Sequence, residues 1–381
     1  MTAHSEKKCI MIVAGEASGD LHGAKLVRAM LAQDPSLFFV GIGGSRLRSA
    51  GVRIVVDAAQ LAVVGITEVF AKGLSLLKGV SSAKRLLKTL APDLLILIDF
   101  PDFNLHLAAK AKRIGIPVLY YISPQIWAWR QGRIRQIKSR VDHMAVILPF
   151  EEAFYRQHQV PATFVGHPLL DEREPVTASE KAPQKIQAPL IGLLPGSRDK
   201  EVLRHLPVML KCATLLRRHF KQIRFVVSRA PTVSGALFDD IMGEFSHGEA
   251  MTVFGGPVGE IFEQSRMVIA VSGTVTLEAA LTGTPTVIIY KVSPVSYWIG
   301  MRLVRVEHIG LINLIAEKRI VPELVQQEVT PENIFKHVEA MLQNPEQFEE
   351  TVAELLRAAG RLGKPGASKR TAALAMKLIR A

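Results

Sequence analysis

The sequence has little cysteine and no long apolar run. Only Cys9 and Cys212 occur among its 381 residues, one in an expected strand and one in an expected helix, so neither a disulfide framework nor a metal site is indicated. No stretch reaches the roughly eighteen apolar residues of a membrane-spanning helix. The apolar run Cys9–Ala14 is too short for a signal peptide. These absences favour a cytosolic protein.

A dinucleotide-binding fingerprint is also absent. The loop GEASGD at 15–20 follows the first expected strand, but it lacks the spacing G-x-G-x-x-G that cradles a dinucleotide. The loop leaves room for a substrate and supplies two carboxylates, Glu16 and Asp20. Asp20 is explained at least as well as the cap of the helix expected from Leu21.

What the sequence has in excess is positive charge. Lysine and arginine number 47 against 35 acidic residues, for a net charge of +12. Nucleic acid, a phospholipid surface and a phosphorylated substrate would each suit such a protein, and charge alone does not choose among them. Hydrophobic residues make up 48% of the chain, which is typical of a globular protein, and the length predicts two domains.

Short apolar runs alternate with helical patterns along the chain, which predicts parallel sheets covered on both faces. A linker rich in charge and proline, Asp171–Pro189, divides the alternation in two. We predict an α/β protein of two Rossmann-like domains facing a cleft, at 1–170 and 190–345, with ligands beyond the carboxyl ends of the strands. The expected strands are Cys9–Ala14, Leu37–Ile42, Arg53–Val56, Leu94–Ile98, Val118–Ile122, Met144–Leu148, Thr163–Val165, Leu190–Leu194, Ile223–Val227, Met251–Phe254, Met267–Val271 and Val287–Ile289.

In the second half, two turns have the features of an anion site. Ser272, Gly273 and Thr274 separate an expected strand from an expected helix at Val275–Leu281. Backbone N–H groups at such a helix start are unpaired and attract phosphate, and Glu278 is placed to accept hydrogen bonds from a ribose. An ordinary βαβ unit is the alternative interpretation.

The other turn, Gly196-Ser197-Arg198, follows the first strand of the same half. It repeats the pattern of a small turn plus a cation, and Arg198 suits a diphosphate. Together the two turns favour a nucleoside diphosphate. Farther along, Asn313 lies in an apolar context, where its amide needs partners from the backbone or from a ligand.

In the first half, Asp99 ends a fully apolar strand and begins the motif DFPDFN. A carboxylate at the carboxyl end of a central parallel strand stands where ligands bind, and partial burial raises its pKa toward a value useful in a general base. Asp102 or Asn104 is expected to cap the following helix.

Two further segments of the first half suit an anionic surface. Tryptophans and arginines interleave in SPQIWAWRQGRIRQIKSR at 123–140, a pattern compatible with nucleic acid, with an anionic membrane or with a plain solvated face. The stretch Leu61–Val80 is more apolar than one packed helix face requires and carries cationic flanks. It is interpreted either as a membrane-binding lip or as a core helix.

Eight segments, in order and across nearly the whole chain, resemble the lipid-A-disaccharide synthase family: GEASGD, DFPDFN, SPQIWAWRQ, LPFEEAFY, FVGHP, LLPGSR, SGTVTLEAAL and NLIAEK…VPELVQ. The resemblance implies an inverting GT-B glycosyltransferase that needs neither metal nor cofactor, and no Asp-x-Asp pair is present to hold a divalent ion. It implies transfer of 2,3-diacylglucosamine from UDP-2,3-diacylglucosamine to 2,3-diacylglucosamine 1-phosphate (lipid X). The products would be lipid A disaccharide 1-phosphate and UDP.

The resemblance also assigns residues. Asp99 and Glu16 would be catalytic. The UDP-sugar ligands would be Ser197, Arg198, Ser272, Gly273, Thr274, Glu278 and Asn313. Independently of the resemblance, the acceptor and lipid side is expected to comprise Ser18, Gln125, Trp127 and Arg130, together with Leu74, Leu76 and Leu77 of the apolar stretch Leu61–Val80. Ile312 departs from the family pattern, which has proline before the asparagine, and the linker and extreme C-terminus match poorly.

Further expectations concern partners and the C-terminus. The helices of 346–381 should pack back on the N-terminal domain. The protein should associate peripherally with the anionic inner face of the cytoplasmic membrane and bind no nucleic acid, and a homodimer is compatible with the sequence. A nucleotide-sugar epimerase or another GT-B transferase would share the UDP site, whereas a nucleic-acid-binding protein would share only the charge.

Overall fold

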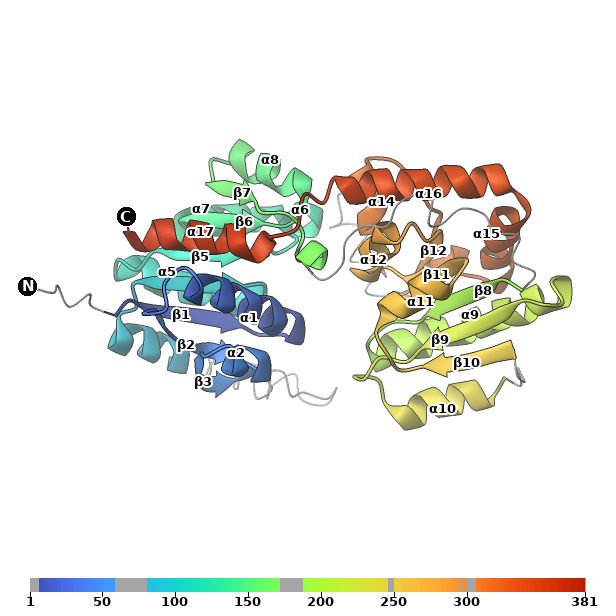
Figure 1. The fold of residues 1–381 in the computed structure, drawn as a ribbon, viewed down its shortest axis with the longest axis horizontal. Helices are drawn as coiled ribbons and strands as arrows, with labels where there is room; N and C mark the ends of the chain where they lie inside the picture. The colour runs from blue at the N-terminus through green and yellow to red at the C-terminus, as the bar shows by residue number, and fades with distance from the viewer. Residues whose placement is uncertain are drawn as a thin grey trace, which may run out of the picture. The chain divides into compact units, whose positions relative to one another are not determined.

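In a computed structural model the chain forms two compact units, each built on one parallel sheet (Figure 1). The structure describes residues 7–58, 81–171, 188–245, 250–294, 297, 298, 300 and 306–380. Unit 1 comprises Met1–Glu172 and Leu362–Ala381, and unit 2 comprises Arg173–Arg361. The stretch Leu61–Val80, with Leu74, Leu76 and Leu77, lies outside the described residues, as does most of the expected linker.

The sheet of unit 1 has seven parallel strands in the order β3-β2-β1-β4-β5-β6-β7. Because β1 lies between β2 and β4, the strand order reverses direction between β1 and β4, which is the point where open α/β sheets bind ligands. The strands are β1 (Cys9–Ala14), β2 (Phe38–Gly43), β3 (Arg53–Asp57), β4 (Leu94–Ile98), β5 (Val118–Tyr121), β6 (His143–Val146) and β7 (Ala162–Phe164).

Helices cover both faces of this sheet, because successive residues of a buried strand point to opposite sides. Ile10 and Ile12 of β1 pack in one cluster with α1 (Ala17–Leu31) and α17 (Ala367–Arg380). Met11 and Val13 pack in another with α5 (Pro101–Arg113), as well as with the helix at 81–90. The remaining helices are α2 (Ser45–Ser49), α6 (Ile126–Trp129), α7 (Ile134–Arg140) and α8 (Pro149–Gln157).

Unit 2 repeats the plan with six parallel strands in the order β10-β9-β8-β11-β12-β13, reversing between β8 and β11. The strands are β8 (Leu190–Leu194), β9 (Arg224–Ser228), β10 (Met251–Phe254), β11 (Met267–Val271), β12 (Thr286–Tyr290) and β13 (Glu323–Val325). The helices are α9 (Asp199–His219), α10 (Gly235–Gly243), α11 (Val258–Gln264), α12 (Val275–Leu281), α14 (Leu311–Ala316), α15 (Pro331–Gln343) and α16 (Pro345–Gly360). The predicted fold class, two Rossmann-like domains, is confirmed.

The C-terminus returns to unit 1 later than expected. Only α17 packs there, against α1. Helix α16, which we also expected on the N-terminal domain, packs instead on α12 and α14 within unit 2. The Asp171 carboxylate, assigned to the linker from sequence, accepts hydrogen bonds from Gly366 N at 2.5 Å and Ala367 N at 3.1 Å. Asp171 therefore caps the N-terminus of α17, the helix with which the chain returns to unit 1.

Among the described residues, no helix combines the length and the apolar character that crossing a bilayer requires. In the same part of the chain, no group of three or more His, Cys, Asp and Glu side chains is arranged to hold a metal ion.

Candidate functional site

Several of the residues singled out from sequence lie at the two points where the strand orders reverse. In unit 1 the loops after β1 and β4 carry Glu16 and Asp99 on adjacent strands, since Ala14 pairs with Ile98. In unit 2 the loops after β8 and β11 carry Arg198 and Ser272, and Ala270 pairs with Leu194. Each unit thus has one candidate site at the position where its topology favours a ligand.

The turn after β4 holds Asp99 in an unusual backbone conformation. Asp99 and Phe100 have φ angles of 45° and 48°, in the left-handed region that side chains other than glycine rarely occupy. The Asp99 carbonyl accepts hydrogen bonds from Tyr120 Oη at 2.5 Å and from Asn104 Nδ2 at 2.6 Å. Asn104 Nδ2 also donates to the carbonyl of Ile98 at 3.1 Å.

Asp99 is the carboxylate of this turn with acid–base character. Burial, and to a lesser extent the charge of Glu16, raise the pKa of Asp99 from 3.8 to about 6, although a hydrogen bond from the Phe100 backbone opposes the shift. A carboxylate with a pKa near 6 is ionised at neutral pH and accepts a proton more readily than an ordinary aspartate. Glu16 lies in the loop after the neighbouring strand β1, and its side chain is exposed.

The turns after β1 and β4 pack directly on one another. A Cβ atom added to Gly15 would lie 2.4 Å from Cγ of the Phe100 ring, so the ring covers the position where another residue would carry a side chain. Helix α1 begins at Ala17 rather than at the predicted Leu21, which puts the last four residues of GEASGD in its first turn. Ser18 is exposed there.

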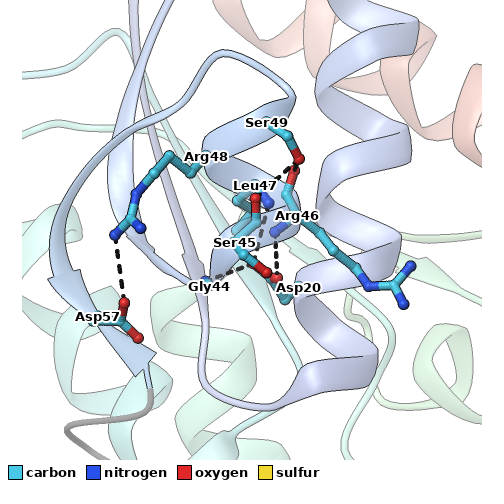
Figure 2. A network of polar contacts seen from close by, with 8 residues as sticks. All are labelled: Asp20, Gly44, Ser45, Arg46, Leu47, Arg48, Ser49 and Asp57. Atoms are coloured by element: carbon cyan, nitrogen blue, oxygen red, sulfur yellow. Dashed lines mark hydrogen bonds and ion pairs between the residues drawn. The ribbon is translucent and has the colours of Figure 1, made fainter.

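Asp20 does not cap its own helix. It lies inside α1 and accepts hydrogen bonds from Gly44 N at 2.6 Å, Arg46 N at 3.0 Å and Leu47 N at 3.3 Å (Figure 2). These N–H groups belong to the start of α2, so the buried Asp20 joins the loops after two neighbouring strands. Its role is structural.

The motif DFPDFN contacts the basic segment that follows β5. Asp102 pairs with Arg133 and, at 3.6 Å, with Arg130. Neither Asp102 nor Asn104 caps α5 as predicted, because the N-cap position belongs to Phe100 and receives no side-chain bond. Asn104 instead reaches back to the end of β4.

The two tryptophans of the basic segment differ in exposure. Trp127, assigned to the acceptor side from sequence, is 7% exposed, and its indole N–H donates to Glu151 Oε1 at 3.0 Å. Trp129 is 41% exposed, and the Arg130 guanidinium lies 4.2 Å from the centroid of its ring. The exposed aromatic surface therefore belongs to Trp129, whereas Trp127 anchors the segment. Gln125 is exposed beside them.

In unit 2 the turn after β8 is open to solvent. The Arg198 side chain is 73% exposed and pairs with Glu201 at 3.1 Å. The other Glu201 oxygen accepts the Ser197 backbone N–H at 2.9 Å. Gly196 has a φ of 113°, which only glycine adopts without strain. This arrangement holds an arginine and a backbone donor at the start of α9.

The turn after β11 matches its prediction closely. Helix α12 spans Val275–Leu281 as expected, Gly283 ends it with a φ of 60°, and a Cβ added to Gly273 would meet no atom within 4 Å. Ser272 Oγ donates to the carbonyl of Ile309 at 3.0 Å. Thr274 is exposed, and Glu278 is partly exposed on the first turn of α12.

The partners of Asn313 come from within unit 2. Asn313 is buried, and its amide nitrogen donates to Glu323 Oε1 at 2.7 Å and to the carbonyl of Val321 at 2.9 Å. Its oxygen accepts the backbone N–H groups of Ile320 and Val321. Of the two sources considered from sequence, backbone or ligand, the backbone and a buried carboxylate supply the bonds seen here. Glu323, which the sequence analysis missed, also accepts Ile309 N at 2.8 Å and so supports the loop that Ser272 contacts.

Comparison with known proteins assigns the family. A model of lipid-A-disaccharide synthetase matches residues 10–377. The chain is 46% identical over 377 residues to the lipid-A-disaccharide synthases of Syntrophus aciditrophicus, where 98% of each chain is covered, and of Geobacter metallireducens, where 98% of this chain and 97% of the relative are covered.

Among solved structures, the calicheamicin glycosyltransferase matches with a TM-score of 0.64, 14% identity, and coverage of 98% of this chain and 99% of the other. The UDP-GlcNAc 2-epimerase of Neisseria meningitidis bound to UDP-GlcNAc matches with a TM-score of 0.59 and 11% identity, covering 97% of this chain and 100% of the other. At these identities the likeness concerns the fold, which is the GT-B arrangement of two Rossmann-like domains. With the sequence match extending over nearly its full length, the chain belongs to the lipid-A-disaccharide synthase family and is a GT-B glycosyltransferase of lipid A biosynthesis.

Proposed function

We propose that the protein transfers 2,3-diacylglucosamine from UDP-2,3-diacylglucosamine to the 6-hydroxyl of lipid X, with inversion at the anomeric carbon. The family supports these substrates, because lipid A disaccharide synthesis requires a sugar donor and a lipid acceptor. The observation that carries the mechanism is Asp99, whose pKa is raised to about 6 at the reversal point of the unit 1 sheet.

Asp99 acts as the general base. Its carboxylate removes the proton of the acceptor hydroxyl as the oxygen attacks the anomeric carbon from the face opposite UDP, so the carbon–oxygen bond to the diphosphate breaks as the new bond forms. Glu16, in the loop after the neighbouring strand β1, helps to position the acceptor. Its negative charge makes Asp99 a stronger base, because one charge disfavours a second nearby.

The turns of unit 2 bind the leaving group. Arg198 and the N–H groups of Gly273 and Thr274, at the turn that Ser272 begins, stabilise the departing diphosphate, which acquires negative charge in the transition state. Ser197 adds a donor, and Glu278 accepts the ribose hydroxyls. Asn313 contributes indirectly, because it donates to Glu323, which accepts the backbone N–H of Ile309, the residue whose carbonyl Ser272 contacts.

Replacement of the base tests the mechanism. We expect Asp99→Asn to lower turnover by about a hundredfold or more, the usual range for a positioned general base, with UDP binding unchanged. The assay is UDP release that depends on both the donor and lipid X, a dependence that an epimerase or a nucleic-acid-binding protein lacks.

A matched control is available on the same sheet. Asp57 also ends a strand, β3, where it pairs with Arg48 at 3.4 Å (Figure 2). Asp57→Asn removes a negative charge from the same end of the sheet and is expected to leave turnover within about twofold of the parent. Near-normal turnover in purified Asp99→Asn would remove Asp99 from the mechanism.

A further inference from the structure

The ends of β4 and β5 carry three residues in the left-handed region. Asp99 and Phe100 follow β4, and Ile122 follows β5 with a φ of 62°. The strands are neighbours, with Ile98 paired to Tyr121. Ile122 is β-branched, for which this conformation is a true outlier. Such a strained conformation persists only where several surrounding contacts hold the backbone in place, and strained residues are concentrated at functional sites.

Two buried side chains supply those contacts. Tyr120 and Asn104 are both 0% exposed, and both donate to the single carbonyl oxygen of Asp99, at 2.5 Å and 2.6 Å. They come from different elements, β5 and α5, so the carbonyl is fixed from two directions. Asn104 N also donates to the carbonyl of Phe100 at 3.0 Å, which fixes the second left-handed residue.

The direction of the Asp99 side chain depends on this turn. If the backbone stayed extended, Asp99 would continue the strand after Ile98, and its side chain would point to the face of the sheet opposite that of Ile98. The left-handed φ turns the chain sharply instead, and the ring of Phe100 comes to rest against Gly15. Because Ala14 pairs with Ile98, this turn lies next to the loop after β1 that carries Glu16.

We propose that Tyr120 and Asn104 are positioning residues for Asp99: their hydrogen bonds to its carbonyl oxygen hold the strained turn that presents the carboxylate beside Glu16. Neither side chain contacts the reacting atoms, and each acts through the backbone of Asp99. This inference rests on the proposed role of Asp99 as the general base.

Tyr120→Phe is the decisive variant, because it removes one hydrogen bond and keeps the ring that packs in the core. We expect kcat to fall about tenfold, the scale of one hydrogen bond, with KM for both substrates nearly unchanged. The acid limb of the kcat profile should also move to lower pH, because a relaxed carboxylate gains solvent. Asn104→Ala should act in the same direction, and if it does not fold, Tyr120→Phe decides alone.

Tyr121→Phe is the matched control. Tyr121 is the next residue of β5, is equally buried, and packs in the cluster on the opposite face of the sheet with α1 and α17. Loss of its hydroxyl should leave both kcat and the pH profile unchanged. A general weakening of the β5 region would affect the two tyrosine variants alike.

The double variant Asp99→Asn with Tyr120→Phe separates positioning from any independent role. If Tyr120 acts through Asp99, the double variant should turn over as slowly as Asp99→Asn alone. A further tenfold loss would overturn the proposal, as would a Tyr120→Phe enzyme indistinguishable from Tyr121→Phe. An inactive Asp99→Asn with an unimpaired Tyr120→Phe would refute the positioning role while leaving the base in place. Normal turnover in Asp99→Asn would instead refute the proposed function.

Discussion

The two candidate sites occupy equivalent positions in equivalent sheets, yet they are built differently. In unit 1 the turn after β4 is strained and clamped by buried side chains, and the space beside Gly15 is filled by an aromatic ring. In unit 2 the turn after β11 is unstrained, and Gly273 faces open space. The charged side chain of the neighbouring turn, Arg198, is largely exposed.

The difference corresponds to two kinds of chemistry. A general base must be held within a fraction of an ångström and kept partly out of water, so its surroundings are rigid and complete. A nucleotide site must admit and release a large anion in every cycle. The proposed site in unit 2 accordingly has an exposed cation, Arg198, paired with a carboxylate, Glu201, that a diphosphate would replace.

The difference between the two sites is tested most strongly by adding the same methyl group to both of them. Gly15→Ala places a Cβ atom against the Phe100 ring and should lower turnover by about a hundredfold, because the turn that holds Asp99 must shift. The free energy of unfolding should fall by about 1–3 kcal/mol, as is usual for overpacking. Steady-state kinetics and denaturant unfolding measure the two effects.

Gly273→Ala is the counterpart in unit 2. With no atom within 4 Å of the added Cβ, its unfolding free energy should stay within about 0.5 kcal/mol of the parent. UDP affinity should nevertheless decrease, because the methyl group lies where phosphate is proposed to approach the backbone. Equal thermal stability and turnover in the two alanine variants would show that the sites do not differ in the way described.

Much of the architecture could be predicted from sequence. Strands β1, β4, β8, β10 and β11 and helix α12 begin and end at the predicted residues, because buried parallel strands appear as short apolar runs bounded by glycine and proline. The stop of α12 was also foreseen from Gly283. These features depend on local chemistry, which a sequence displays directly.

The misses share one physical cause, which is that the deciding partner lies far away in the chain. Asp20 caps α2 rather than α1 because β1 and β2 pair side by side, a relation set by the sheet. The burial of Trp127 was equally hidden from the sequence, since the acceptor of its indole hydrogen is Glu151 on α8, 24 residues away. No local pattern reports such partners.

The same limit applies to the candidate sites. The carboxylate of Asp99 could be chosen from its place at the end of an apolar strand, but the role of Tyr120 could not, since a tyrosine in an apolar strand is ordinary core. Helix α16 was placed on the wrong domain because both C-terminal helices are amphipathic, and amphipathicity predicts burial without naming the surface that is covered.

The exposed character of the unit 2 site leads to a smaller prediction. Arg198→Ala and Glu278→Ala should each weaken UDP binding by roughly 1.5–3 kcal/mol, the scale of a charge-assisted hydrogen bond. Arg198→Ala should leave the melting temperature almost unchanged, because an exposed ion pair contributes little to stability. Isothermal titration calorimetry measures the affinity, and Arg204→Ala, an exposed arginine farther along α9, is the control. Unchanged UDP affinity in both variants would contradict the site.

The smallest expected effect concerns the pH dependence of the stability of unit 1, and it does not involve catalysis. His167 is buried, and burial, with the His22 charge second, lowers its pKa from 6.5 to about 3. Between pH 6.5 and pH 3, His167 binds a proton in the unfolded chain but not in the folded chain. The stability contributed by neutral His167 is therefore complete above pH 6.5 and is lost as the pH falls toward 3. At pH 6 the loss relative to pH 8 should be about 1 kcal/mol.

His167→Asn isolates this contribution. The Asn oxygen can replace Nδ1 as acceptor for the Leu169 backbone N–H, which lies at 3.2 Å, but the amide does not titrate. Denaturant unfolding followed by tryptophan fluorescence, to which Trp127 contributes from the interior of unit 1, gives the free energy at both pH values for both proteins. The loss between pH 8 and pH 6 should be smaller in the variant by about 1 kcal/mol. An equal loss in both proteins would mean that His167 takes up its proton in the folded state, and that this part of unit 1 is open to water.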